Sequence, residues 1–150
     1  MDRTDTRILK LLQEDADRPV AEIAAAVGLS PTPCWRRIQK LKASGVIRRT
    51  VAIVDPQAIG RGLNVFVGVE ARDHTPDWLE QFTTMVSPMP EVMEIYRMAG
   101  ELDYLLRISV RDMAQFDDFY RRLIAAVPLK NVTSNFAMER VKHTTAYPVE

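Results

Sequence analysis

The sequence predicts an α+β protein, with an N-terminal helix-turn-helix unit (winged-helix-like) joined to a C-terminal ferredoxin-like βαββαβ unit. Apolar residues recur at three-to-four spacing over residues 1–50, which is typical of packed helices. From residue 63 onward, strand patterns are interleaved with two helical ones. The charge is divided as well: 10 − 6 = +4 over residues 1–50 and 10 − 14 = −4 over residues 51–150. We expect a domain at 1–50, a linker strand and hinge at 51–62, and a domain at 63–150.

Three short helices account for the first fifty residues. The first covers residues 3–14, after Asp2 as its N-cap. The second covers residues 20–27, and Gly28 is placed to end it in the left-handed conformation. Ser30-Pro31 then supplies an N-cap and a proline at the first helical position, so the third helix should run to about residue 44. The tight turn between the last two helices predicts a helix-turn-helix.

The third helix has two distinct faces at 100° per residue. Cys34, Ile38 and Leu41 share one face, which should pack inward. The opposite face carries side chains suited to base edges and phosphates. No acidic residue occurs between Glu22 and Asp55, which favours a nucleic-acid interface over the alternative of a solvated basic helix. The candidate DNA-binding residues are Ser30, Thr32, Pro33, Arg36, Arg37, Gln39, Lys40 and Lys42.

The residues around this helix have plainer interpretations. Val46 to Val54 alternates enough to be a strand, either a reduced wing or the link to the next domain. Arg48 and Arg49 at its start are phosphate contacts or solvated charges. Cys34 is interpreted as a packed small hydrophobe, and Trp35 as a packing or dimer-contact residue.

The last hundred residues alternate between strands and helices. Leu63 to Ala71 is a half-buried strand, and Thr75-Pro76 begins a helix. Asp112 caps a second helix. Both helices should cover one sheet face, and the other face, with large apolar side chains, should meet another copy of the chain. The remaining expected strands are residues 92–99, 103–110 and 132–141.

The first half resembles the Lrp/AsnC regulators, also called leucine-responsive or feast/famine transcription factors. The stretch SPTPCWRRIQKLKASGVI, residues 30–47, is similar to their recognition helix. The opening MDRTDTRILKLLQED and the stretch VAEIAAAVGLS match as well. Met1 stands where the family often has leucine.

The second half resembles the effector and assembly domain of the same family. MAGELDYLLRISV, residues 98–110, is similar to the family's G-x-x-D-Y hairpin, and NVTSNFAMERVK, residues 131–142, to its last strand. Val127-Pro128-Leu129-Lys130 departs from the usual Pro-Gly-Val turn. The resemblance covers nearly the whole chain and is least specific at the hinge.

The resemblance implies a DNA-binding transcriptional regulator whose activity is modulated by a small-molecule effector, with an amino acid as the expected effector. It also implies homodimers formed through the sheets, rings such as octamers, and an effector bound between dimers near the hairpin. A glycine turn exposes N–H groups for a carboxylate, and an aspartate can accept from an ammonium group. The implied effector-binding residues are Gly100, Asp103, Tyr104, Ser134 and Phe136.

Two other classes stay open at this point. One is an enzyme similar to siroheme decarboxylases, for which His74 and His143 are the only histidines, both expected at the surface. The other is a ligand-free architectural DNA-binding protein. The single Cys34 excludes an intrachain disulfide, and no Cys/His spacing suits a metal, so we expect no metal and no cofactor. Without a long apolar run or a signal segment, we expect no membrane association and a cytoplasmic location.

Overall fold

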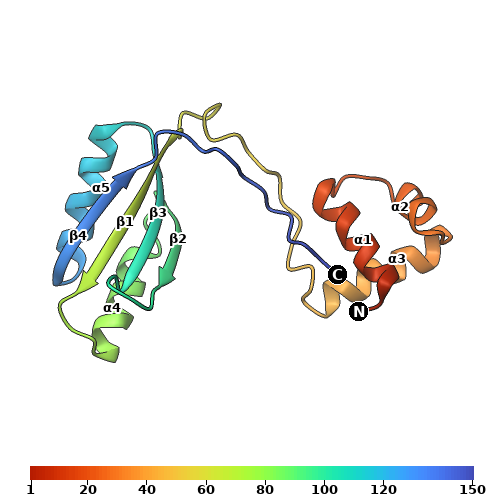
Figure 1. Ribbon diagram of the computed structural model, residues 1–150, viewed down its shortest axis with the longest axis horizontal. Helices are drawn as coiled ribbons and strands as arrows, with labels where there is room; N and C mark the ends of the chain where they lie inside the picture. Colours follow the sequence, from red (N-terminus) through yellow and green to blue (C-terminus); the bar gives the residue numbers. More distant parts are fainter. The chain divides into compact units, whose positions relative to one another are not determined.

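The computed structural model describes residues 1–150, which form two compact units. One unit comprises residues 1–53 together with residues 141–150, and the other comprises residues 54–140. The first unit is helical, and the second holds a four-stranded antiparallel sheet with two helices. The predicted α+β class is confirmed (Figure 1).

The helical unit contains α1 (Arg3–Glu14), α2 (Val20–Val27) and α3 (Pro31–Ala43). A capping box begins α1, because the side chains of Asp2 and Asp5 each accept from the other's backbone N–H. Gly28 ends α2 at φ 76°, in the left-handed region that glycine adopts without strain. Apolar residues of all three helices form its core: Ile8, Leu9, Ile23, Ala24, Val27, Cys34, Ile38 and Leu41.

The sheet unit follows the predicted βαββαβ order. Its strands lie in the order β2-β3-β1-β4, and every neighbouring pair is antiparallel. Figure 1 shows both helices on the same side of this sheet. The elements are β1 (Leu63–Ala71), α4 (Pro76–Val86), β2 (Val92–Arg97), β3 (Tyr104–Val110), α5 (Met113–Ala126) and β4 (Leu129–Phe136).

Alternate residues of the central strands separate the two sheet faces. Val65, Val67 and Val69 of β1 are fully buried in one core with Phe82 of α4 and Phe119 of α5. Side chains of a strand alternate between faces, so the residues between these valines lie on the open face. The helices therefore cover one face of the sheet, and the other is left uncovered within the chain.

The strand expected over Val46–Val54 is wrong, because residues 44–62 contain no strand. A strand needs a pairing partner, and no strand of the helical unit offers one. The last strand is also misplaced, since it covers Leu129–Phe136 and not residues 132–141. Its only partner is β1, which begins at Leu63, so pairing stops just beyond Phe136. The following residues continue to the helical unit, where residues 141–150 pack.

Candidate functional site

The structure confirms the two faces predicted for α3. Cys34, Ile38 and Leu41 are 0%, 5% and 4% exposed and pack on the other two helices. Arg36 and Lys40 lie on the exposed side. Burial holds the back of the helix in place, so its front is presented at a fixed angle. The other predicted DNA-binding residues on exposed positions are Ser30, Thr32, Pro33 and Lys42, while Gln39 is half-buried.

The charges on this front are not compensated within the chain. None of Arg36, Lys40 and Lys42 forms an ion pair, although seven contacts between an arginine or lysine and a carboxylate occur elsewhere in the chain. Uncompensated cations on one helix face produce a positive potential that attracts a polyanion. The arrangement can therefore hold phosphates and present polar side chains to base edges.

Arg37 differs from the other predicted DNA-binding residues. Its Nη1 donates to Asp2 Oδ2 at 2.6 Å and to Asp5 Oδ1 at 2.8 Å. The pKa of Asp2 is lowered by the backbone N–H of Asp5 and then by Arg37. The pKa of Asp5 is lowered by the backbone N–H of Asp2, with Arg37 adding to the effect. Arg37 thus ties α3 to the N-terminus of α1, and its charge is engaged inside the unit.

Arg48 and Arg49 follow α3 in an extended segment. The N–H of Ile47 donates to the carbonyl of Leu41 at 3.0 Å, and the Ile47 side chain packs against the helical core. Gly45, at φ 76°, makes the turn that reverses the chain there. The two arginines are exposed immediately after this anchor.

The hairpin between β2 and β3 carries three of the predicted effector-binding residues. Gly100 has φ 146°, a conformation that L side chains rarely adopt, and space around it is open. Asp103 Oδ2 accepts from the Ala71 N–H at 2.7 Å, and Oδ1 lies 3.6 Å from His74 Nδ1. The Asp103 carboxylate is therefore partly engaged in joining the hairpin to the end of β1. Its side chain remains 31% exposed.

Tyr104 lies in the core and not at the surface. It is 7% exposed, and its ring lies 4.8 Å from that of Phe82 and 5.7 Å from that of Trp78, centroid to centroid. Tyr104 therefore fixes the base of the hairpin against α4.

The two candidates on β4 lie away from the hairpin. Through β1, the register aligns Tyr104 with Val132, whereas Ser134 and Phe136 are two and four residues further along β4. At about 3.4 Å per residue, Phe136 lies roughly 14 Å along β4 from the position level with Tyr104. Its ring packs edge-on against Phe116 at 4.9 Å. The structure brings Gly100, Asp103 and Tyr104 together and leaves Phe136 apart from them.

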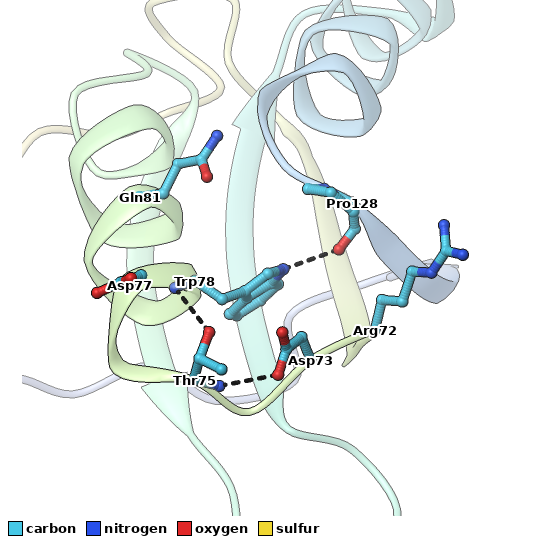
Figure 2. Close-up of a pocket in the computed structure, with 7 residues that line it drawn as sticks. All are labelled: Arg72, Asp73, Thr75, Asp77, Trp78, Gln81 and Pro128. Atoms are coloured by element: carbon cyan, nitrogen blue, oxygen red, sulfur yellow. Dashed lines mark hydrogen bonds between the residues drawn. The ribbon is translucent and has the colours of Figure 1, made fainter.

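A pocket of about 450 Å³ opens beside the first turn of α4. Figure 2 shows the Trp78 indole donating from Nε1 to the Pro128 carbonyl, at 2.8 Å. Thr75 Oγ1 caps the helix by accepting from the Trp78 N–H. None of the predicted effector-binding residues lines this pocket; the Thr75-Pro76 helix start and the unusual Pro128 loop were the sequence signals near it. Its lining comprises Arg72, Asp73, Thr75, Asp77, Trp78, Gln81 and Pro128.

Two kinds of site are absent from the chain. No group of three or more His, Cys, Asp or Glu side chains is arranged to hold a metal ion. None of the helices is both long enough and apolar enough to span a bilayer.

A helix-turn-helix with an uncompensated cationic front, joined to a separate βαββαβ unit, points to the class of ligand-responsive DNA-binding regulators. Comparison with known families agrees with this class. The Lrp/AsnC ligand binding domain matches residues 64–147, and the AsnC-type helix-turn-helix domain matches residues 1–42. The chain therefore belongs to the Lrp/AsnC family of transcriptional regulators, as the sequence resemblance predicted.

Individual relatives span nearly the full chain. The DNA-binding transcriptional activator DecR of Escherichia coli (strain K12) is 46% identical over 100% of this chain and 99% of its own length. The glutamate uptake regulatory protein of Zymomonas mobilis is 44% identical over 99% of this chain and 91% of its own length. Each of these proteins is named as a regulator, and no enzyme family is indicated.

Solved structures share the complete fold. An AsnC family transcriptional regulator from Agrobacterium tumefaciens superposes with a TM-score of 0.95 at 51% identity, covering 99% of this chain and 97% of that one. A transcriptional regulator from Neisseria meningitidis was solved as a complex with L-Met. It superposes with a TM-score of 0.93 at 34% identity, and the match covers 99% of this chain and 96% of that one. The chain is thus a DNA-binding transcriptional regulator with a ligand-binding domain.

Proposed function

We propose that this chain binds specific sequences of double-stranded DNA through α3, and that an amino acid modulates this binding. The observation that carries the proposal is the front of α3, where Arg36, Lys40 and Lys42 are exposed and unpaired while the back of the helix is buried. Cations held at a fixed angle position a helix in the major groove. Arg36 faces base edges, and Lys42 contacts the phosphate backbone.

Arg37 has a positioning role in this proposal. Its guanidinium is already engaged by two carboxylates of α1, at 2.6 and 2.8 Å. Loss of Arg37 therefore disturbs the angle of α3 and does not remove a phosphate contact.

An amino acid is the proposed effector class. The Neisseria relative was solved with L-Met, and the Zymomonas relative is named for glutamate uptake, which supports this class without selecting its member. We place the effector at the hairpin end of the sheet, where Gly100 frees backbone N–H groups for the carboxylate. The exposed part of the Asp103 carboxylate accepts from the ammonium group.

Assembly completes the proposed function. A single helix-turn-helix makes few contacts, so specific binding needs at least a dimer that reads two half-sites about one helical turn apart. The open face of the sheet, which exposes Phe66 and Tyr96, is the surface for homodimerisation. Such dimers would assemble into rings, with an octamer as the expected size.

The effector is tested first by thermal shift with the twenty amino acids, because a ligand that binds only the folded chain raises its melting temperature. The amino acid found is then added to DNA titrations of the wild type and Asp103→Ala. We expect the wild-type DNA affinity to change and the variant to respond weakly, with its ligand-free DNA binding retained. A full response in Asp103→Ala would remove Asp103 from the site. No thermal shift with any amino acid would favour a ligand-free architectural role.

A further inference from the structure

The last residues of the chain pack on the DNA-binding unit and are not free. Residues 141–150 group with α1, α2 and α3, although they follow the last strand of the sheet unit in sequence. The chain therefore runs between the two units twice, near residues 53–54 and again near residues 140–141.

Specific contacts fasten this segment to α1. The Gln13 side chain forms a reciprocal pair with the backbone of Tyr147: its Nε2 donates to the carbonyl at 3.0 Å, and its Oε1 accepts from the N–H at 2.7 Å. Thr6 Oγ1 lies 3.3 Å from the carbonyl oxygen of Glu150. A side-chain amide that satisfies both backbone groups of one residue fixes the position and direction of the segment.

An apolar contact lies between these polar ones. Val149 is half-buried and packs against the core formed by α1, α2 and α3. Thr6, whose hydroxyl contacts the carbonyl of the neighbouring Glu150, is only 7% exposed. In contrast, Val141 at the other end of the segment is 87% exposed. The docking is therefore confined to residues 147–150.

We propose that residues 147–150 form a clasp on α1 that positions the helix-turn-helix for DNA binding. The clasp holds α1 through Thr6 and Gln13, and Arg37 in turn joins α1 to α3. The recognition helix is thus fastened through α1 to a segment that follows the last strand of the ligand-binding unit. A change at the end of β4 can reach α1 through this segment, in addition to the connection that follows α3.

Hydrogen exchange tests the clasp directly in the full chain, without DNA. Val149→Asp places a charge in the apolar contact, and Val141→Asp makes the same change at an exposed position of the same segment. We expect amides of α1 to exchange about tenfold faster in Val149→Asp, since an apolar contact and three hydrogen bonds hold the clasp. The Val141→Asp variant should match the wild type, and amides of β1 and β3 should be unchanged in both.

Gln13→Glu is a milder second variant, because it removes the donor to the Tyr147 carbonyl and keeps an acceptor. It should accelerate exchange in α1 in the same direction, which keeps the test valid if Val149→Asp folds poorly. Equal α1 exchange in Gln13→Glu, Val141→Asp and the wild type would overturn the clasp.

The positioning role rests on the proposed DNA binding and has its own readout. Gln13→Met, which removes both hydrogen bonds to Tyr147 without adding a charge, should weaken binding to specific DNA several-fold while the slope of log affinity against log salt stays unchanged, because no phosphate contact is lost. Faster α1 exchange with unaltered DNA affinity would overturn the positioning role and leave the proposed function of α3 standing. Absence of DNA binding by the wild type would instead remove the proposed function.

Discussion

Two carboxylates and one guanidinium at the start of α1 determine how the recognition helix is held. Sequence patterns place Arg37 on the edge of a basic face, and nothing in the local sequence reveals that Asp2 and Asp5 would reach it. The three residues meet only because α1 and α3 pack together across a separation of 32 to 35 residues. Local periodicity predicts which side of a helix is buried, whereas it cannot predict which charges the packing brings into contact.

The Arg37 contact should be visible in the acid dependence of stability. The pKa values of Asp2 and Asp5 are lowered in the folded chain, so the stabilisation is present above their ordinary values and is lost as the pH falls through the lowered ones. Arg37→Met should therefore unfold at lower urea than the wild type at pH 7, and the difference should shrink below about pH 4. A difference that persists at acid pH would mean that Arg37 acts through packing alone.

Glu91 offers a second test at the residue scale. It is 4% exposed and is paired with Arg122 at 2.7 Å. Burial acts to raise the pKa of Glu91, but the hydrogen bonds and charge around it, chiefly those of Arg122, outweigh burial and lower it. Arg122→Met should cost about 1–3 kcal/mol, below the cost for a fully buried pair because the Arg122 side chain is 38% exposed.

The pH dependence of that cost has a definite sign. In Arg122→Met, burial acts to raise the pKa of Glu91 and is opposed only by the weaker hydrogen bonds from its own backbone and from Gln115, so the pKa of Glu91 is higher in the folded variant than in the folded wild type. The loss of stability should be largest near pH 7 and should shrink toward pH 4, as measured by urea unfolding. Glu91→Gln combined with Arg122→Met should recover part of the loss at pH 7. A constant loss across this range would contradict the role of the ion pair.

At the scale of elements, capping residues were the most reliable signals. Asp2, Thr75 and Asp112 were predicted at helix starts, and each side chain accepts a backbone N–H there. Ser30 also occupies its predicted N-cap position, but its side chain makes no capping hydrogen bond. A capping hydrogen bond joins residues that are close in sequence, so it does not depend on how the helix packs in the fold. The strand expected over Val46–Val54 failed for the opposite reason, because a strand depends on a partner that the local sequence does not contain.

The Asp112 cap gives a measurable prediction. Its carboxylate accepts from the Gln115 N–H at 2.8 Å, at the start of a helix that covers the sheet. Asp112→Ala should lower the free energy of unfolding by about 1 kcal/mol, whereas Asp112→Asn, which can still cap, should lose much less. Equal losses of unfolding free energy in the two variants would show that the capping hydrogen bond does not stabilise the chain.

The candidate site was predictable only in part at this scale. The front of α3 follows from a 100° rotation per residue, and the structure leaves it exposed as expected. The environment of the hairpin residues could not be predicted in this way. Tyr104 is buried by aromatic contacts with α4, and the sequence pattern of β3 does not predict those contacts. The pocket beside Trp78 was missed because it depends on α4 and the Pro128 loop meeting in space.

At the scale of the whole molecule, assembly on the open face of the sheet is the prediction with the widest consequences. Phe66, 38% exposed, lies on that face between the buried positions of β1. Phe66→Asp should shift the chain toward monomer in light scattering at micromolar concentration, because it places a charge in the proposed apolar contact. Met113→Asp, at a position 56% exposed on α5, is the matched control and should leave the mass unchanged. A wild-type monomer would exclude the proposed dimer.

DNA titration of the wild type, Arg36→Ala and Lys42→Ala tests the role of α3 most directly. Each protein is titrated over a range of salt with a duplex selected from a random pool and with a scrambled duplex. We expect Arg36→Ala to lose about 1–3 kcal/mol on the selected duplex and to discriminate less between the two. Lys42→Ala should weaken both duplexes alike and lower the salt slope by about one. Unchanged affinity and discrimination in Arg36→Ala would contradict recognition through the front of α3.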